Sequence, residues 1–339
     1  MTRRSPTLNE VARLAGVSPS AVSRTFTVGA SVADKTRAKV LQAAELIGYR
    51  PNLLARSLSR QRSGTVGIAV TRLENSFNSL LLEELATALQ RVGLGCRLIV
   101  TGDRDAVDVR IEEVLQHQID VLVLCAVNLS SRIEEECAAV GVPVIMVNRI
   151  TPGVGRSARA IAIVGSNEEG GRVVADHLAE AGHRSFAFIA GSVDASNSRE
   201  REAGFIAGLA KSGLPAPIVE TGHYTFNGAM DATRTILGTV NRPDALFCAN
   251  DHMALAAITV AQTEFGLSVG KDISIVGFDD SPAARFGAGL TSFSQPASLM
   301  AEEAARNIIA LLGGNRTEDG LFVVPGSLKI RGSSRPANP

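Results

Sequence analysis

The sequence predicts a small all-α headpiece followed by an α/β body of two doubly wound lobes with parallel sheets. Residues 7–47 carry apolar side chains at helical spacing. After Gly64, short apolar runs alternate with amphipathic stretches, and the alternation is long enough for two parallel sheets. With 339 residues, of which 45% are hydrophobic and 20% charged, the chain can form two or three domains.

Three short helices are predicted in the headpiece. The first covers about residues 7–14 and is followed by Gly16, and the second is expected to begin at Pro19 with Ser18 as its N-cap. The third spans residues 34–47 and stops at Gly48. The apolar faces are formed by Leu8, Val11, Ala12 and Ala15 in the first helix, by Ala21, Val22 and Thr25 in the second, and by Val40, Leu41, Ala44 and Ile47 in the third.

The body is predicted to alternate strands and helices. Strands are expected at residues 65–70, 96–100, 120–127 and 142–148, and again at 161–165, 185–191, 217–221, 244–250 and 272–279. Helices are expected at residues 77–92, 104–117, 168–181, 198–212, 227–238 and 252–264. The helix at 297–312 and the strand-like run at 321–332 follow the second half. We expect them to return to the first half, which would make the connection between the lobes multiple and hinge-like.

These patterns divide the chain into a headpiece (residues 1–50), a hinge helix with its linker (51–63) and a body (64–339). Within the body, the first lobe is expected to comprise about residues 64–162 and 294–330. The second lobe is expected to comprise about residues 163–293.

Charge is segregated along the chain although the net charge is zero. Residues 1–62 contain 11 basic and 3 acidic residues, a charge of +8, so the remainder carries −8. This distribution indicates a basic module for a polyanion, joined to an acidic body with a different task. A disordered basic tail is the alternative, and the apolar periodicity of residues 8–47 argues against it.

Composition and motifs exclude several classes of protein. No signal peptide or apolar run of about 18 residues occurs, which predicts a cytoplasmic protein, associated with the nucleoid, that has no contact with membrane. The 4 cysteines have no metal-site spacing and are expected to be buried thiols, so no metal and no cofactor is predicted. No G-x-S-x-G, H-E-x-x-H or P-loop motif occurs, and the 5 histidines are expected on the surface. The chain is therefore not expected to be an enzyme.

The first two headpiece helices have the arrangement of a helix-turn-helix. A tight turn containing Gly16 separates them, and the second helix begins with polar residues, as in helices that enter the major groove of DNA. An ordinary helical hairpin is the alternative. The charge of +8 favours binding of double-stranded DNA.

Three stretches of the sequence are similar to a known protein family. They resemble the lactose/galactose repressor (LacI) family of bacterial transcription regulators, and their sequences are TLNEVARLAGVSPSAVSRTF, SVADKTRAKVLQAAELIGYRPNLLARSL and ALFCANDHMALAAITVAQTEFGLSVGKDISIVGFDDSP. The resemblance covers almost the whole chain. It implies a DNA-binding headpiece, a hinge helix, and an effector-binding body that is similar to periplasmic sugar-binding proteins.

The resemblance also implies which headpiece residues contact DNA. It places Pro19 and Ser20 at the base-reading start of the recognition helix and Arg24 one turn later. Arg24 is expected to read a guanine, since its guanidinium can donate two hydrogen bonds to that base. Side chains suited to phosphate contacts are Thr7, Ser18, Ser23 and Thr36. Ser18 is equally expected to act as a helix cap. Thr27 and Val28 depart from the Asn-Gly pair that is frequent in the family.

The hinge segment is too short to be a stable helix alone, because nucleation costs more than two turns return. The resemblance implies that it folds in the minor groove, where Leu58 wedges between base pairs. The hinge residues implied to contact DNA are Asn52, Leu54, Ala55 and Leu58. A small core stripe formed by Leu54 and Leu58 is the alternative.

In the body, the resemblance implies an effector site between the lobes, and a sugar is the expected effector. The implied contacts are Phe77, Asn148, Asn197, Arg201, Tyr224, Asn250 and Asp279. Simpler roles exist for some of them. Asn250 could cap the next helix, Asp279 and Asp280 could cap a turn, and Arg201 could pair with Glu200 or Glu202 on the surface.

Together these features predict a transcriptional regulator, expected to be a repressor, that acts as a homodimer on a palindromic operator under the control of a small molecule. A transport-type sugar-binding protein is the alternative. Such a protein would need an export signal and would have no use for residues 1–62.

Overall fold

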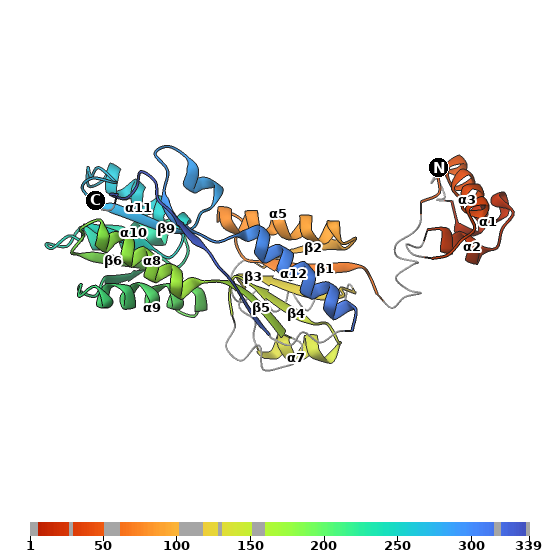
Figure 1. Cartoon of the computed structure of the whole chain (residues 1–339), viewed down its shortest axis with the longest axis horizontal. Helices are drawn as coiled ribbons and strands as arrows, with labels where there is room; N and C mark the ends of the chain where they lie inside the picture. The colour runs from red at the N-terminus through yellow and green to blue at the C-terminus, as the bar shows by residue number, and fades with distance from the viewer. Residues whose placement is uncertain are drawn as a thin grey trace. The chain divides into compact units, whose positions relative to one another are not determined.

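The structure is a computed structural model that describes residues 6–26, 30–50, 62–101, 118–127, 131–150, 160–314 and 320–336. The chain divides into two compact units, Met1–Ser63 and Gly64–Pro339, and Figure 1 shows the elements of each. Several predictions lie outside the described residues: the hinge helix with Asn52, Leu54, Ala55 and Leu58, the pair Thr27 and Val28, and the helix at 104–117.

The headpiece contains the three predicted helices, α1 (Leu8–Ala15), α2 (Pro19–Thr25) and α3 (Asp34–Ile47). Thr7 and Glu10 form a capping box at the start of α1, which satisfies backbone N–H groups that have no helical partner. Gly16 ends α1 in the left-handed conformation with φ 66°, which glycine adopts without steric cost. The Ser18 side chain caps α2 by accepting a hydrogen bond from the Ala21 backbone N–H.

A small core joins the three helices. It is formed by Val11, Ala12, Ala15, Val22, Val40, Ala43 and Ala44. The expected apolar face of α3 is wrong at one position, because Leu41 is exposed and Ala43 is buried instead. The rings of Phe26 and Tyr49 close one side of the core, with centroids 5.8 Å apart. A small but continuous apolar core therefore holds the three helices of the headpiece together.

The first lobe of the body contains a six-stranded parallel sheet among the described residues. Its strands, in spatial order, are β11 (Leu321–Val324), β5 (Ala160–Gly165), β4 (Val144–Val147), β3 (Val121–Cys125), β1 (Thr65–Val70) and β2 (Gly95–Val100). Helices α5 (Ser76–Arg91) and α12 (Ala297–Leu312) pack side by side on one face (Figure 1), and α7 (Ser131–Ala139), which was not predicted, covers the other.

The second lobe contains a second six-stranded sheet within the described chain. Its strands, in spatial order, are β12 (Ser327–Lys329), β10 (Thr291–Ser294), β9 (Ser274–Asp279), β8 (Ala245–Cys248), β6 (Phe186–Ala190) and β7 (Ile218–Thr221). All neighbours pair in parallel except β12, which runs antiparallel to β10. The surrounding helices are α8 (Asn167–Glu180), α9 (Ser196–Lys211), α10 (Phe226–Leu237), α11 (Asp251–Thr263) and the short η2 (Pro282–Arg285).

The predicted architecture of a headpiece and two parallel-sheet lobes is confirmed, but two strands belong to the other lobe. The run at 161–165, expected to begin the second half, is β5 and lies inside the first sheet between β4 and β11. Residues 327–329, expected in the first lobe, form β12 of the second sheet. In the described chain the backbone therefore crosses between the lobes three times: from β5 to α8, from β10 to α12, and from β11 to β12.

Two expectations about side-chain burial are wrong in part. Cys96 is exposed, whereas the other cysteines are buried. His177 and His183 are buried rather than on the surface, and burial lowers the pKa of both. His183 Nε2 lies 2.7 Å from Ser274 Oγ, and its Nδ1 lies 3.2 Å from Asp244 Oδ2.

Among the helices described, none is long and apolar enough to span a bilayer.

Close packing of α8 on α9 depends on glycine. A Cβ added to Gly204 would overlap the backbone carbonyl of Glu168, and one added to Gly171 would overlap the carbonyl of Arg201. The two helices can therefore approach this closely only because no side chain stands between them. This approach also brings Asn167 at the start of α8 next to Arg201 on α9, whose Nε donates to Asn167 Oδ1 over 3.0 Å.

We expect Gly204→Ala to lower the free energy of unfolding of the body by about 1–3 kcal/mol, because the added methyl group must push the two helices apart. Urea unfolding followed by circular dichroism measures the change. The control is Ala207→Ser, an exposed position on the same helix that should change stability by less than about 0.5 kcal/mol. Equal stability of Gly204→Ala and the parent would contradict the packing argument.

Candidate functional site

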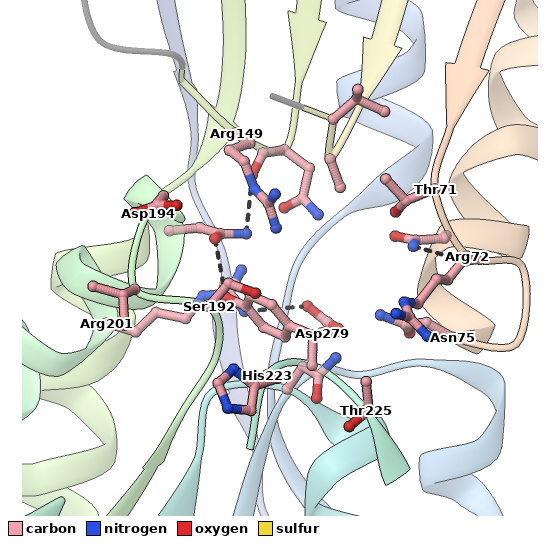
Figure 2. Close-up of a pocket in the computed structure, with 18 residues that line it drawn as sticks. Thr71, Arg72, Asn75, Arg149, Ser192, Asp194, Arg201, His223, Thr225 and Asp279 are labelled. Carbon is pink, nitrogen blue, oxygen red and sulfur yellow. Dashed lines mark hydrogen bonds and ion pairs between the residues drawn. The ribbon is translucent and has the colours of Figure 1, made fainter. Parts of the chain in front are cut away.

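A cavity of about 470 Å³ lies between the two lobes of the body, at the carboxyl ends of both sheets. Loops that follow β1 and β4, and the start of α5, supply side chains from the first lobe. In the second lobe they come from loops after β6, β7 and β8, from the start of α9 and from the end of β9. Figure 2 shows these groups facing one another, with Thr71, Arg72 and Asn75 opposite Arg201 and Asp279. Carboxyl ends of parallel strands are the usual place for ligands in open α/β sheets.

Arg201 is the largest fully buried side chain of the described chain, with 1% of its surface exposed. Its Nε donates to Asn167 Oδ1 over 3.0 Å, and its Nη1 donates to the Ala249 carbonyl over 2.5 Å. The guanidinium also lies over the Phe278 ring, with Cζ 3.7 Å from the ring centroid. Surface pairing of Arg201 with Glu200 or Glu202 is therefore wrong, and its Nη2, which has no partner, remains available to a ligand.

Asp279 pairs with Arg201 at the floor of the cavity, with Oδ1 3.6 Å from Nη1. The same oxygen accepts a hydrogen bond of 2.6 Å from Gln295 Nε2. Burial raises the pKa of Asp279, and the charge of Arg201 opposes that shift. The turn alternative is not observed, since Ser281 is the N-cap residue of η2 and Asp280 pairs with Arg331.

Two asparagines that line the cavity each have a buried side-chain atom without a hydrogen-bond partner. Asn250 caps α11 by accepting a hydrogen bond from the Met253 N–H over 3.0 Å, so the expected cap exists, but its Nδ2 has no partner. Asn148 follows β4 with φ 69°, and its buried Oδ1 also has no partner. Buried polar atoms without partners are costly, which indicates that a ligand or water supplies their hydrogen bonds.

Tyr224 provides an aromatic wall. Its ring lies against Gly191, where any Cβ would overlap it, and its hydroxyl donates to Asn197 Oδ1 over 2.9 Å. Asn197 Nδ2 in turn donates to the Asn148 carbonyl of the other lobe over 3.2 Å. The Arg149 guanidinium lies over the ring, with Cζ 5.7 Å from its centroid. Burial raises the pKa of the Tyr224 hydroxyl, which keeps it a hydrogen-bond donor.

The structure brings together six of the seven residues predicted for the effector site. They are Asn148, Asn197, Arg201, Tyr224, Asn250 and Asp279. Phe77, the seventh, does not line the cavity, because its side chain is fully buried in the core under α5. The neighbouring Asn75 and Asn78 line the cavity instead, so this segment contributes to the cavity through side chains other than Phe77.

Several cavity residues were not predicted. Arg72 and Arg149 are the second residues after β1 and β4, and Asp194 and His223 lie in loops that follow β6 and β7. Their positions after strands are a signal that the sequence contains, but the same signal occurs at strand ends without a cavity. Among the described residues, no cluster of histidine, cysteine and carboxylate side chains could hold a metal ion.

In the headpiece, the start of α2 presents a polar exposed surface. Ser18, Pro19, Ser20, Ser23 and Arg24 are exposed, and Arg24 Nε donates to the Ser20 carbonyl over 3.4 Å. Thr7 is exposed at the start of α1, where its hydroxyl belongs to the capping box, and Thr36 is half-buried on α3. This surface has the composition of a recognition helix that contacts bases and phosphates.

Comparison with protein families gives two matches. Residues 7–52 match the bacterial regulatory proteins of the lacI family, and residues 175–334 match the periplasmic binding protein-like domain. The HTH-type transcriptional regulator CelR of Thermobifida fusca is 33% identical over 98% of this chain and 99% of its own length.

Solved structures give the same picture. The Lac repressor dimer bound to operator and the anti-inducer ONPF matches with a TM-score of 0.84 and 28% identity, over 98% of this chain and 100% of that chain. A complex of the transcriptional regulator CelR with cellobiose matches with a TM-score of 0.73 and 30% identity, over 97% and 100% of the two chains.

Behind the cavity, Asp251 at the start of α11 is buried and has only neutral hydrogen-bond donors. Ser292 Oγ donates to its Oδ1 over 2.5 Å, and the Ser281 N–H donates to its Oδ2 over 2.7 Å. Burial raises the pKa of Asp251 above the ordinary carboxyl value of 3.8. Between pH 3.8 and about 7 the folded protein therefore holds a proton that the unfolded chain has released.

The parent should therefore lose stability relative to Asp251→Asn as pH rises from about 4 toward neutral, by on the order of 1 kcal/mol per pH unit. Urea unfolding of both proteins across this range measures the difference. Asp272→Asn changes an exposed position in the same lobe, and its free energy of unfolding should vary with pH in parallel with that of the parent. Identical pH profiles of Asp251→Asn and the parent would show that Asp251 is not protonated in the folded state.

Proposed function

Because the chain belongs to the lacI family of bacterial regulatory proteins, we propose that it is a transcriptional repressor whose operator binding is controlled by a sugar in the cavity between the lobes. It binds a palindromic operator as a dimer, since two headpieces related by a twofold axis read inverted half-sites. The Lac repressor, whose fold it shares along almost its whole length, is described as a dimer bound to operator.

One observation supports the sugar above all. Asn148 Oδ1, Arg201 Nη2 and Asn250 Nδ2 are buried and unpaired, and they provide one acceptor and two donors in a single cavity. A hydroxyl group both donates and accepts, so neighbouring hydroxyls on a sugar ring can satisfy all three atoms together. Tyr224 adds an aromatic surface for the apolar face of such a ring.

The size of the cavity and the names of the relatives indicate which sugars to test first. A volume of about 470 Å³ is within the range of small-molecule sites. CelR is described in complex with cellobiose, so disaccharides come first in a search for the effector. The relatives are named as regulators and repressors, and a transport-type binding protein would leave the headpiece without a purpose.

On the DNA side, Arg24 is the proposed base reader and Pro19 and Ser20 its neighbours at the base edges. Ser18, Ser23, Thr7 and Thr36 are proposed to contact phosphates. The hinge residues Asn52, Leu54, Ala55 and Leu58 are proposed to bind the minor groove, with Leu58 as the wedge at the operator centre. The sugar acts by changing the relative position of the two lobes. A coupling free energy of about 1–3 kcal/mol between sugar binding and operator binding would then appear as a measurable change in operator affinity.

A thermal-shift screen of neutral disaccharides, pentoses and hexoses tests the effector class. A sugar present at about 100 times its dissociation constant should stabilise the parent by about 2.7 kcal/mol. Arg201→Lys and Asp279→Asn should abolish this stabilisation, because each changes the polar floor of the cavity. Arg234→Lys makes the same chemical change on the surface of α10 and should respond like the parent. Stabilisation by no sugar, or undiminished stabilisation of both cavity variants, would exclude the proposed site.

Operator binding tests the headpiece. Arg24→Ala should reduce discrimination between the operator and a duplex of mixed sequence by about 1–3 kcal/mol, since a bidentate base contact is lost. Arg13→Ala removes the same charge from an exposed position on α1. It should weaken binding of both duplexes to a similar extent, and the loss should depend on salt concentration. Fluorescence anisotropy with labelled duplexes measures both affinities. Unchanged discrimination in Arg24→Ala would assign base reading to another residue.

A further inference from the structure

Two of the three crossings between the lobes are hydrogen-bonded to each other. Ser166, between β5 and α8, donates its backbone N–H to the Val324 carbonyl over 3.1 Å. The Gly326 N–H, between β11 and β12, donates back to Ser166 Oγ over 3.1 Å. These two crossings therefore form one hydrogen-bonded unit, and a change of the angle between the lobes must act on it.

Gln295 lies on the remaining crossing, between β10 and α12, and is 3% exposed. Its backbone N–H donates to the Asp279 carbonyl over 3.2 Å, and its Nε2 donates to Asp279 Oδ1 over 2.6 Å. Its buried Oε1 has no hydrogen-bond partner and lies over Gly165 at the end of β5, where a Cβ would overlap it. One amide thus touches two crossings and a carboxylate of the cavity.

The other half of the cavity floor is tied to a crossing as well. Arg201, which pairs with Asp279, donates from Nε to Asn167 Oδ1 over 3.0 Å, and Asn167 is the first residue of α8. The pair at the cavity floor is therefore held between two crossings, through Asn167 on one side and Gln295 on the other.

We propose that Gln295 is a positioning residue that couples the cavity to the angle between the lobes. Its amide holds the Asp279 carboxylate to the crossing while its oxygen lies on Gly165. A hydroxyl that donates to Asp279 competes for the oxygen that Gln295 uses, and the amide must then change its contacts with both crossings. The identity of that hydroxyl rests on the proposed function, but the coupling is a property of the free protein.

The angle between the lobes can be measured without any effector. Cys96 on β2 is exposed and can carry a spin label in the first lobe, while Val240→Cys places a label at a fully exposed position of the second lobe. Cys125, Cys137 and Cys248 are buried, and burial raises the pKa of the Cys125 thiol to about 12, so they should resist labelling. Dilution of the labelled protein with unlabelled protein restricts double electron–electron resonance to distances within one chain.

Two substitutions at Gln295 separate the hydrogen bond from simple packing. Gln295→Met keeps the length of the side chain but removes the donor, so the distance between the labels should shift and broaden at every pH. Gln295→Glu places a second carboxyl group against Asp279. The other ionisable groups that act on that site are Arg201, Asp251 and Tyr224. At about pH 6 the two carboxyls can share one proton and should restore the parent distance, whereas at about pH 9 their repulsion should shift it.

Asn307→Leu is the matched control, because it removes a buried amide from α12 that bonds only within that helix in the described contacts. It should leave the label distance unchanged. Thermal unfolding of each variant confirms that the lobes are folded. A parent-like distance in Gln295→Met, or a distance in Gln295→Glu that does not depend on pH, would overturn the proposal. Failure of every sugar to bind would refute the effector class and leave this measurement intact.

Discussion

The ion pair of Arg201 and Asp279 is the constraint on which the body depends. Both side chains are almost fully buried, and removing two charges from water costs several kcal/mol for each ion unless other contacts replace the lost hydration. Here the replacement comes from Asn167, the Ala249 carbonyl, the face of Phe278 and Gln295. Both residues also line the cavity, and Arg201 Nη2 has no hydrogen-bond partner within the described chain.

The two lobes contribute to the cavity in different ways. The second lobe supplies the buried pair and the Tyr224 wall. Arg201 lies on α9, which packs closely on α8 through glycine, and the Tyr224 ring lies against Gly191. The first lobe supplies Arg72, Asn75 and Asn148 from strand ends and the start of α5. A ligand held between them must therefore satisfy a rigid polar floor on one side and polar loops on the other, which links occupancy of the cavity to the relative position of the lobes.

The sequence predicts local structure and strand-end polarity well, because periodicity and capping act over a few residues. It predicts the assignment of strands to sheets less well. β5 and β12 read as ordinary strands, and only the crossings between the lobes decide which sheet each one joins. The same limit applies to Phe77 and Arg201. Phe77 belongs to the core although it lies beside residues that line the cavity. Arg201 is buried although it lies in a charged stretch at the start of a helix. Tertiary packing decides both positions.

The aromatic composition has an optical consequence. The chain contains no tryptophan and 2 tyrosines, and the two compact units each contain one of them. Tyr49 packs against Phe26 in the headpiece core, while Tyr224 forms the cavity wall. Tyrosine emission is therefore divided into one signal from the DNA-binding unit and one from the sensing unit. Replacement of Tyr49 by phenylalanine would leave tyrosine emission that reports the cavity alone.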